Sequence, residues 1–311
     1  MKKLLLIFFL LFSFLFATDV TKFIKYNSYV IDPYNHNRVT SEAQGYGLLY
    51  AYLTNNKKLF DSMWRWTKTH MQRRDSLFAW NYNNGRVIDY NNATDGDLFI
   101  AYSLLRASYK WHNVGYYEES RKIIKELKRY ILEINNNMIL LPGKHGFVKE
   151  NGIEVFPAYY IKFIFDRFYD ETNDITWKYI ADYTEVLYNQ RLSDRMLFSF
   201  FNKNFSNVSV VTMDVYRVIL YQYLSNGHIE FLKNSFKEIN KFFINNGYIP
   251  LEYRFSSLTQ TRTESPYCVY GLFYLLYDNK AYLKKYLDLK KVDKKNYFCS
   301  FLDFFLQKGI E

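Results

Sequence analysis

The sequence predicts an all-α protein whose helices pair as antiparallel hairpins in a closed helical toroid. Apolar residues recur at three- and four-residue spacing, as in Leu98, Tyr102 and Leu105, which is the period of a helix with one buried face. Alternation typical of strands is scarce. Only five prolines and twelve glycines occur, and several cluster between the helical patterns, so short turns separate the helices. A stacked solenoid is the second architecture, although no self-similar repeat supports it.

Two of these helices open with carboxylates. The stretch from Thr40 to Gly47 places Glu42 at the start of an apolar helix. The stretch from Asn91 to Tyr102 repeats the design with Asp95 and Asp97. Carboxyl groups held on rigid supports are what the hydrolysis of a glycosidic bond requires, so this arrangement suggests sugar chemistry.

The remaining helices follow in order along the chain. A pattern over roughly 57–70 lies between the two carboxylate-headed helices, and the run from Ile123 to Ile131 marks the helix after them. Further helical patterns cover roughly 158–170, 174–190, 214–225, 228–245, 265–276 and 280–288. The last helix is marked by Phe298, Phe301, Phe304 and Phe305.

The first 17 residues are typical of a secretory signal peptide. Lys2 and Lys3 form the charged region, residues 4–16 are almost wholly apolar, and Ala17 offers a small residue at the cleavage site. An uncleaved anchor is the alternative, but the apolar run is short for a span of about 20 residues. Residues 18–311 are then expected to form a single exported domain that is not stably inserted in a membrane. The periplasm is the expected location, and secretion from the cell is the alternative.

Composition and motif content exclude several classes of partner. The net charge is +10, but the lysines are scattered among acids and no nucleic-acid motif occurs, so no nucleic-acid partner is expected. The five histidines lack metal-ligand spacing, and no P-loop or dinucleotide fingerprint occurs, so neither a metal nor another cofactor is expected. Cys268 and Cys299 are the only cysteines, which leaves open one disulfide or two buried thiols.

Several short motifs occur in a fixed order over most of the chain after the leader. They are Val30 to Pro33, Thr40 to Gly47, Phe78 to Trp80, Ala93 to Tyr102, Leu140 to Phe147, Phe156 to Tyr159 and Met213 to Val218. In these motifs the chain resembles glycoside hydrolase family 8, and within it the endoglucanases that accompany bacterial cellulose synthases. The resemblance implies an (α/α)6 barrel that cleaves β-1,4-glucan with inversion of configuration.

The resemblance also implies roles for three carboxylates. Glu42 would be the general acid, Asp214 the general base, and Asp95 the carboxylate that holds the sugar at the point of cleavage. Inverting hydrolysis needs a protonated carboxyl on one side of the bond and an ionised one about 6.5–9.5 Å away, with room for a water between them. Each acid also has an ordinary interpretation, since an acid at a helix start stabilises the helix by about 0.3–1 kcal/mol or caps its backbone.

Four further residues are predicted to contact the substrate. Sugar rings present C–H faces that stack on aromatic rings, and Trp80 with Tyr82 offers such a platform. Tyr159 occupies a position that matches the family. Arg217 lies three residues after Asp214 and either orients that carboxylate or merely pairs with it. Most other aromatic residues follow helical spacing and are expected in the core.

Several positions depart from the family pattern. Met213 stands where a tyrosine commonly precedes the base, so a polar contact near Asp214 is missing. Ala43 and Gly45 replace glycine and serine, a small-for-small exchange that leaves the helix start intact. Ala158 replaces a serine, which alters the expected wall of the cleft.

These features together predict an exported endo-β-1,4-glucanase, a cellulase, whose partner is β-1,4-glucan and which would serve a cellulose synthase complex. Activity on xylan, mixed-linkage glucan or chitosan is an alternative, because the catalytic carboxylates do not define the sugar. A glycan-binding protein that has lost catalysis through Met213 is an alternative of another class, and a polysaccharide lyase on a similar toroid is a third.

Overall fold

The computed structural model describes residues 19–254, 259–293 and 295–310, and helices dominate this part of the chain. The expected signal peptide, residues 1–17, lies outside the described residues. The α-helices are α2 (Ser41–Leu53), α3 (Lys57–Met71), α4 (Thr94–Lys110), α5 (Val114–Leu127), α6 (Lys162–Thr172), α7 (Ile175–Tyr188), α8 (Met213–Tyr216), α9 (Val218–Asn226), α10 (Leu232–Ser235), α11 (Lys237–Asn246), α12 (Tyr267–Tyr277), α13 (Lys280–Val292) and α14 (Tyr297–Lys308).

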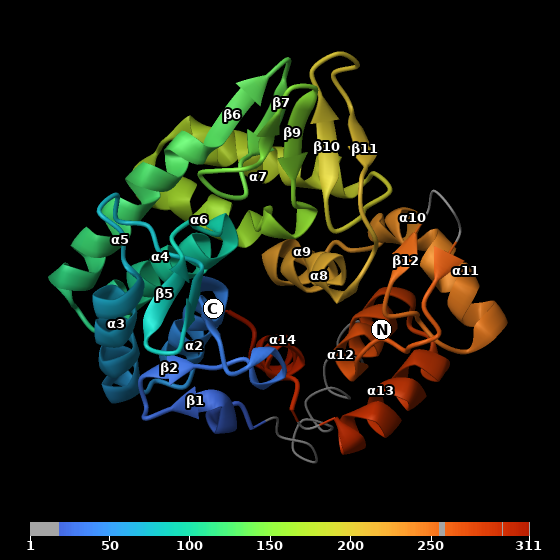
Figure 1. The fold of residues 1–311 in the computed structure, drawn as a ribbon, viewed down its shortest axis with the longest axis horizontal. Helices are drawn as coiled ribbons and strands as arrows, with labels where there is room; N and C mark the ends of the chain where they lie inside the picture. The colour runs from blue at the N-terminus through green and yellow to red at the C-terminus, as the bar shows by residue number, and fades with distance from the viewer. Residues whose placement is uncertain (1–18, 255–258, 294, 311) are drawn as a thin grey trace.

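The longer helices form a closed ring with a second layer outside it (Figure 1). In the inner layer α2 contacts α4, α4 contacts α6, α6 contacts α9, and α9 contacts α12. Helix α12 contacts α14, which returns to α2 and closes the ring. Helices α3, α5, α7 and α13 pack on the outside, against α2, α4, α6 and α12 respectively. This arrangement confirms the predicted barrel of helix hairpins.

The amino-acid pattern explains which helices lie inside. In α2 nearly every residue from Ala43 to Tyr52 is buried, and α4 is buried almost throughout from Thr94 to Leu105. In α3 and α5 only one stripe is buried, so these helices are amphipathic and cover the barrel. A helix that is apolar on all sides needs neighbours on all sides, which only the inner layer provides.

Short antiparallel strands occupy the connections between helices. They form five small sheets with the orders β1-β2, β3-β4-β5, β6-β7, β8-β9-β10-β11 and β12-β13. Their bounds are β1 (Ile24–Lys25), β2 (Tyr29–Val30), β3 (Val39–Thr40), β4 (Asn81–Asn83), β5 (Arg86–Asp89), β6 (Ile131–Ile134), β7 (Asn137–Leu140), β8 (Val148–Lys149), β9 (Gly152–Val155), β10 (Met196–Ser199), β11 (Phe205–Asn207), β12 (Tyr253–Arg254) and β13 (Thr259–Gln260). Alternation of polar and apolar residues does not reveal these strands, because each is only two to four residues long.

Some helix boundaries differ from those predicted. Helix α5 ends at Leu127, a 3-10 turn covers Lys128–Tyr130, and Ile131 begins strand β6. The predicted helix over 214–225 is divided into α8 and α9 at Arg217, and the one over 228–245 is divided into α10 and α11 at Phe236. Periodicity cannot reveal such breaks, because both halves keep the same buried face.

Cys268 and Cys299 form a disulfide that joins α12 to α14, two neighbours in the inner ring. The sequence left this pairing open. The bond closes the part of the ring where the end of the chain returns to its beginning, and it lies beside Tyr297 and Phe298 at the start of α14.

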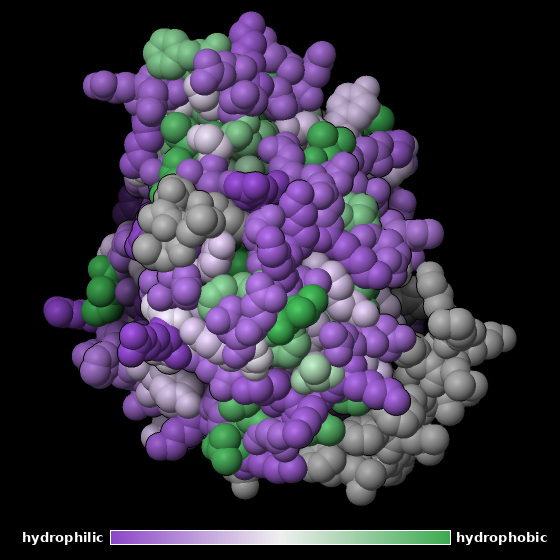
Figure 2. Space-filling model, turned by 90° about the vertical axis from the view of Figure 1, so that its right-hand side faces the viewer, coloured by the Kyte–Doolittle hydropathy of each residue, from purple (hydrophilic) through white to green (hydrophobic). Residues whose placement is uncertain are grey.

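The outer surface shown in Figure 2 is mainly hydrophilic, with hydrophobic residues scattered among polar ones. In the described part of the chain, no helix has the length and apolar character that crossing a bilayer requires.

Candidate active site

The first turns of three helices meet at one cavity of about 350 Å³. Helix α2 contributes Glu42, α4 contributes Asp95 and α8 contributes Asp214, so the fold brings together the three predicted carboxylates from distant parts of the sequence. The lining residues are Asp32, Tyr34, Asn35, Arg38, Thr40, Ser41, Glu42, Trp80, Ala93, Asp95, Tyr159, Met213, Asp214, Arg217, Asn296, Tyr297 and Phe298. A larger hollow of about 780 Å³ lies outside the ring between α5 and α7, but Asp174 is its only acidic lining residue.

Helix α2 holds Glu42 through its first turn. The Oγ1 atom of Thr40 accepts a hydrogen bond from the Ala43 amide at 3.1 Å and caps the helix. Tyr46, one turn along the same helix, donates its hydroxyl to Glu42 Oε1 at 3.2 Å. The Tyr46 hydroxyl also contacts that of Tyr221 in α9 at 2.5 Å, so the side chain of Glu42 is tied to the opposite wall of the ring.

Arg217 lies between two of the carboxylates. Its guanidinium pairs with Glu42, and Nη2 lies 3.2 Å from Asp95 Oδ2. The side chains of Arg217 and Asp95 are only 5% and 3% exposed, whereas that of Glu42 is 16% exposed and faces the cavity. The buried guanidinium attracts both carboxylates. The carboxylates in turn offset the free-energy cost of burying its charge, which would be high without a partner.

Asp95 lies deepest in the site. Burial raises the pKa of Asp95 to about 7, and the charge of Asp214 acts in the same direction. The Gly96 amide, 2.8 Å from Asp95 Oδ1, and the Tyr159 hydroxyl donate hydrogen bonds that oppose this rise. Tyr159 therefore lies at the cavity and contacts Asp95.

Asp214 lies in the first turn of α8, which is capped by Thr212. Its side chain is exposed at the cavity, although the surrounding protein still desolvates the carboxyl group in part. Burial raises the pKa of Asp214, and the positive charges of Arg38 and Arg195 act against that rise. The neighbouring Met213 lines the cavity with an apolar side chain where the family pattern has a tyrosine.

The two predicted platform residues lie in different places. Trp80 lines the cavity, and its Nε1 donates to Asp89 Oδ2 at 2.7 Å. Tyr82 does not line this cavity. Its ring packs instead edge-on against Trp66 at 5.1 Å and His70 at 5.8 Å, on the outer side of the sheet β3-β4-β5. Trp80 precedes strand β4, whereas Tyr82 lies within it, so the two rings do not share one face of a strand.

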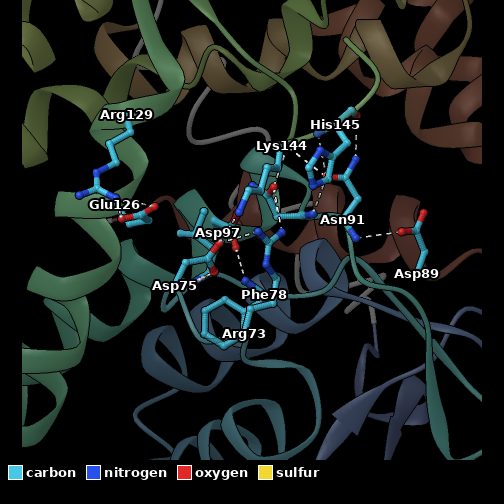
Figure 3. A network of polar contacts seen from close by, with 12 residues as sticks. Arg73, Asp75, Phe78, Asp89, Asn91, Asp97, Glu126, Arg129, Lys144 and His145 are labelled. Carbon is cyan, nitrogen blue, oxygen red and sulfur yellow. Dashed lines mark hydrogen bonds and ion pairs between the residues drawn. The ribbon is translucent and has the colours of Figure 1, made fainter. Parts of the chain in front are cut away.

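A polar network that includes Asp97 and Asn91 joins the start of α4 to the loop after β7 (Figure 3). Buried Asp97 accepts hydrogen bonds from the Phe78 amide at 2.9 Å and from Asn92 Nδ2 at 2.8 Å. Asn91 bonds the backbone of the loop after β7, at His145, and its own amide donates to Asp89 Oδ1 at 2.8 Å. Asp97 thus has a supporting place behind the cavity.

The sequence did not point to every residue at the cavity. Asp32 lies in the motif from Val30 to Pro33, but the sequence does not predict its contacts with the Tyr34 amide and with Arg38. The guanidinium of Arg38 lies 5.5 Å from the centre of the Trp80 ring. Tyr297 and Phe298 belong to an apolar helical pattern, so no local signal separates them from core residues.

The arrangement supports acid–base chemistry on a neutral polar substrate. The carboxyl groups of Glu42, Asp95 and Asp214 face one cavity together with Arg217, and Trp80 supplies an aromatic wall. Among the residues that the structure describes, no group of three His, Cys, Asp or Glu side chains could hold a metal ion.

Comparisons with known proteins identify the family of this chain. The family model of the glycosyl hydrolases family 8 matches residues 20–309. An endoglucanase of Cellulomonas uda is 31% identical over 174 residues, which cover 54% of this chain and 48% of that protein. A probable endoglucanase of Novacetimonas hansenii is 32% identical over 166 residues, 52% of this chain and 48% of that protein. The matched segments span about half the length of these relatives.

Solved structures share the fold over nearly the whole chain. The endo-β-1,4-glucanase of Acetobacter xylinum superposes with a TM-score of 0.81 at 24% identity, covering 93% of this chain and 95% of that one. A family 8 endoglucanase of Klebsiella pneumoniae gives a TM-score of 0.80 at 21% identity, with coverage of 94% and 97%.

Proposed function

Because the chain belongs to the glycosyl hydrolases of family 8, we propose that it is an endo-β-1,4-glucanase that hydrolyses β-1,4-glucan with inversion of configuration. The observation that carries the proposal is the convergence of Glu42, Asp95 and Asp214 on one cavity with Arg217 among them. Acids that merely began three separate helices would have no reason to meet there.

In the proposed reaction, Glu42 donates a proton to the leaving oxygen while Asp214 takes one from the attacking water. Asp95, at the bottom of the cavity, accepts hydrogen bonds from the hydroxyls of the sugar at the point of cleavage. The Tyr159 hydroxyl lies against Asp95 and keeps that carboxylate oriented. Trp80 offers a face for an adjoining sugar ring.

The contact between Arg217 and Glu42 must weaken before Glu42 can act as the general acid. The Arg217 guanidinium contacts Glu42 and so stabilises the ionised carboxylate, whereas a general acid must hold a proton. Since Arg217 also contacts Asp95 and Tyr46, substrate entering between Glu42 and Arg217 would leave the guanidinium with these two partners. We infer that binding of glucan shifts Arg217 towards Asp95 and frees Glu42 to take up its proton.

The test is release of reducing ends from carboxymethyl cellulose by the protein without residues 1–17, beside Glu42→Gln and Asp214→Asn. Both variants keep the shape of the side chain and remove its acid–base function, so activity should fall at least about a thousandfold. Glu230→Gln, an exposed acid with a side chain 79% accessible, is the matched control and should behave as the parent. The anomer first released is read by NMR: the α-anomer supports inversion, and the β-anomer would exclude it.

Two other functions remain as candidates. The first is hydrolysis of xylan, mixed-linkage glucan or chitosan, because the carboxylates do not determine which of these sugars is bound. The same four proteins are assayed on each polymer. Loss of catalysis is favoured by Met213, which replaces a polar contact beside the base. A protein that binds cello-oligosaccharides but never forms new reducing ends would show that this candidate is correct.

We also propose that the protein is exported to the periplasm and acts together with a cellulose synthase complex. The disulfide between Cys268 and Cys299 supports export, because such bonds persist in oxidising compartments. Cell fractionation of the full chain tests the location. Deletion of the gene, followed by measurement of cellulose yield, tests the proposed role in cellulose synthesis.

A further inference from the structure

Asp194 is a half-buried acid that the proposed reaction does not use. It lies just before β10, and its backbone amide donates to Val210 O at 3.0 Å, which fixes it beside the segment that leads into α8. Its carboxyl group is directed at Thr212. The Thr212 amide lies 2.9 Å from Asp194 Oδ1, and the Thr212 hydroxyl lies 2.8 Å from Oδ2.

Thr212 transmits this contact to the proposed base. It is the N-cap of α8, and its Oγ1 accepts a hydrogen bond from the Asp214 amide at 3.2 Å. Helix α8 is only four residues long, and the Val215 amide in the same short helix also donates a hydrogen bond to Asp194. An unbroken chain of hydrogen bonds therefore runs from the Asp194 carboxyl through Thr212 to the backbone of Asp214.

We propose that Asp194 is the positioning residue of Asp214, acting through the Thr212 hydroxyl. The proposal rests on the assignment of Asp214 as general base. A catalytic carboxylate displaced by about 1 Å can lose about a hundredfold in rate, so a residue that fixes its backbone controls turnover without touching the substrate.

The charges around Asp194 and Asp214 differ. Burial raises the pKa of Asp194 to about 7, and the charge of Asp214 acts in the same direction. Arg38 and Arg195 face Asp214 instead and favour its ionised form. The Thr212 amide donates to Asp194 Oδ1 and the Thr212 hydroxyl donates to Oδ2, so the Asp194 carboxyl group accepts both hydrogen bonds. Asparagine keeps the shape and one acceptor oxygen for the Thr212 amide, and its NH2 group can donate to Thr212 Oγ1, so it should largely replace this aspartate.

The experiment compares kcat and KM for the parent, Asp194→Ala, Asp194→Asn and Thr212→Val. Asp194→Ala and Thr212→Val should lower kcat about tenfold to a hundredfold with KM within about twofold. Asp194→Asn should restore kcat to within about threefold of the parent. Asp182→Ala, which removes an exposed acid of α7, is the matched control. Equal loss in Asp194→Ala and Asp194→Asn, or no loss in either, would overturn the proposal.

Amide hydrogen exchange over residues 212–218 provides a second measurement that does not depend on activity. Exchange should be faster in Asp194→Ala and Thr212→Val than in the parent, and close to the parent in Asp194→Asn. Unchanged exchange in Asp194→Ala would refute the positioning contact. If the parent cleaves no glucan but exchange follows the expected order, the assignment of function fails while the contact from Asp194 to α8 stands.

Discussion

The backbones of Gly96 in α4 and Glu42 in α2 lie in direct contact. A Cβ atom on Gly96 would lie 2.7 Å from the Glu42 nitrogen, closer than real Cβ contacts come, and it would also meet Ser41. Only a residue without a side chain lets the starts of the two helices approach so closely. This approach is what places Asp95 and Glu42 on either side of one guanidinium.

Gly96→Ala should therefore force the first turns of α2 and α4 apart. We expect a loss of about 1–3 kcal/mol in the free energy of unfolding, typical of overpacking, and a larger proportional loss of kcat. Urea unfolding and reducing-end assays measure the two effects. Gly115→Ala is the control, because its Cβ would meet only Asn113 Oδ1, at 3.2 Å. Equal behaviour of the two variants would show that the close approach is unimportant.

Arg217→Met should destabilise the protein more than any exposed charge deletion. It leaves Glu42 and Asp95 without their shared cation, and breaking a buried pair costs about 3–5 kcal/mol. Chemical denaturation measures the loss. Arg129→Met removes an arginine whose side chain is 70% exposed and paired with Glu126, so it should change stability by less than about 1 kcal/mol. A small effect of Arg217→Met would mean that water already reaches both acids.

Arg38→Gln should move the acid limb of the pH–activity profile to higher pH. The general base works only when ionised, so kcat/KM falls as the pH drops through the pKa of Asp214. Arg38 holds that pKa down against the rise caused by burial, and its removal lets the pKa increase. The midpoint should shift up by about half a unit to one unit. Arg86→Gln on β5 is the control, and a shift to lower pH for Arg38→Gln would contradict the assignment of Asp214.

Replacing both cysteines by serine should weaken the closure of the ring between α12 and α14. For a sequence separation of 31 residues, the chain-entropy estimate gives a loss of about 3–4 kcal/mol. Thermal unfolding of Cys268→Ser/Cys299→Ser against the parent measures it. Because Tyr297 and Phe298 precede Cys299 and line the cavity, affinity for cello-oligosaccharides should fall as well. Reduction of the parent with dithiothreitol should reproduce both changes.

The sequence by itself determined the helical class, because the spacing of apolar residues follows directly from the period of a helix. It also determined where Glu42, Asp95 and Asp214 lie on their helices, since each opens a first turn. Both are local properties of the chain, so the pattern of neighbouring residues is enough to predict them. The short strands and the breaks at Arg217 and Phe236 were missed because they leave the periodic pattern unchanged.

Only the tertiary structure decided which of these residues meet. Arg217 pairs with acids 175 and 122 positions earlier in the chain, a relationship that no spacing rule contains. Trp80 and Tyr82 are two residues apart, yet the Trp80 ring lines the cavity while the Tyr82 ring packs against Trp66 and His70 of α3. The pairing of Cys268 with Cys299 likewise depends on the closure of the ring. Contacts of this kind are set by the packing of whole helices against one another, and the order of residues along one helix does not specify them.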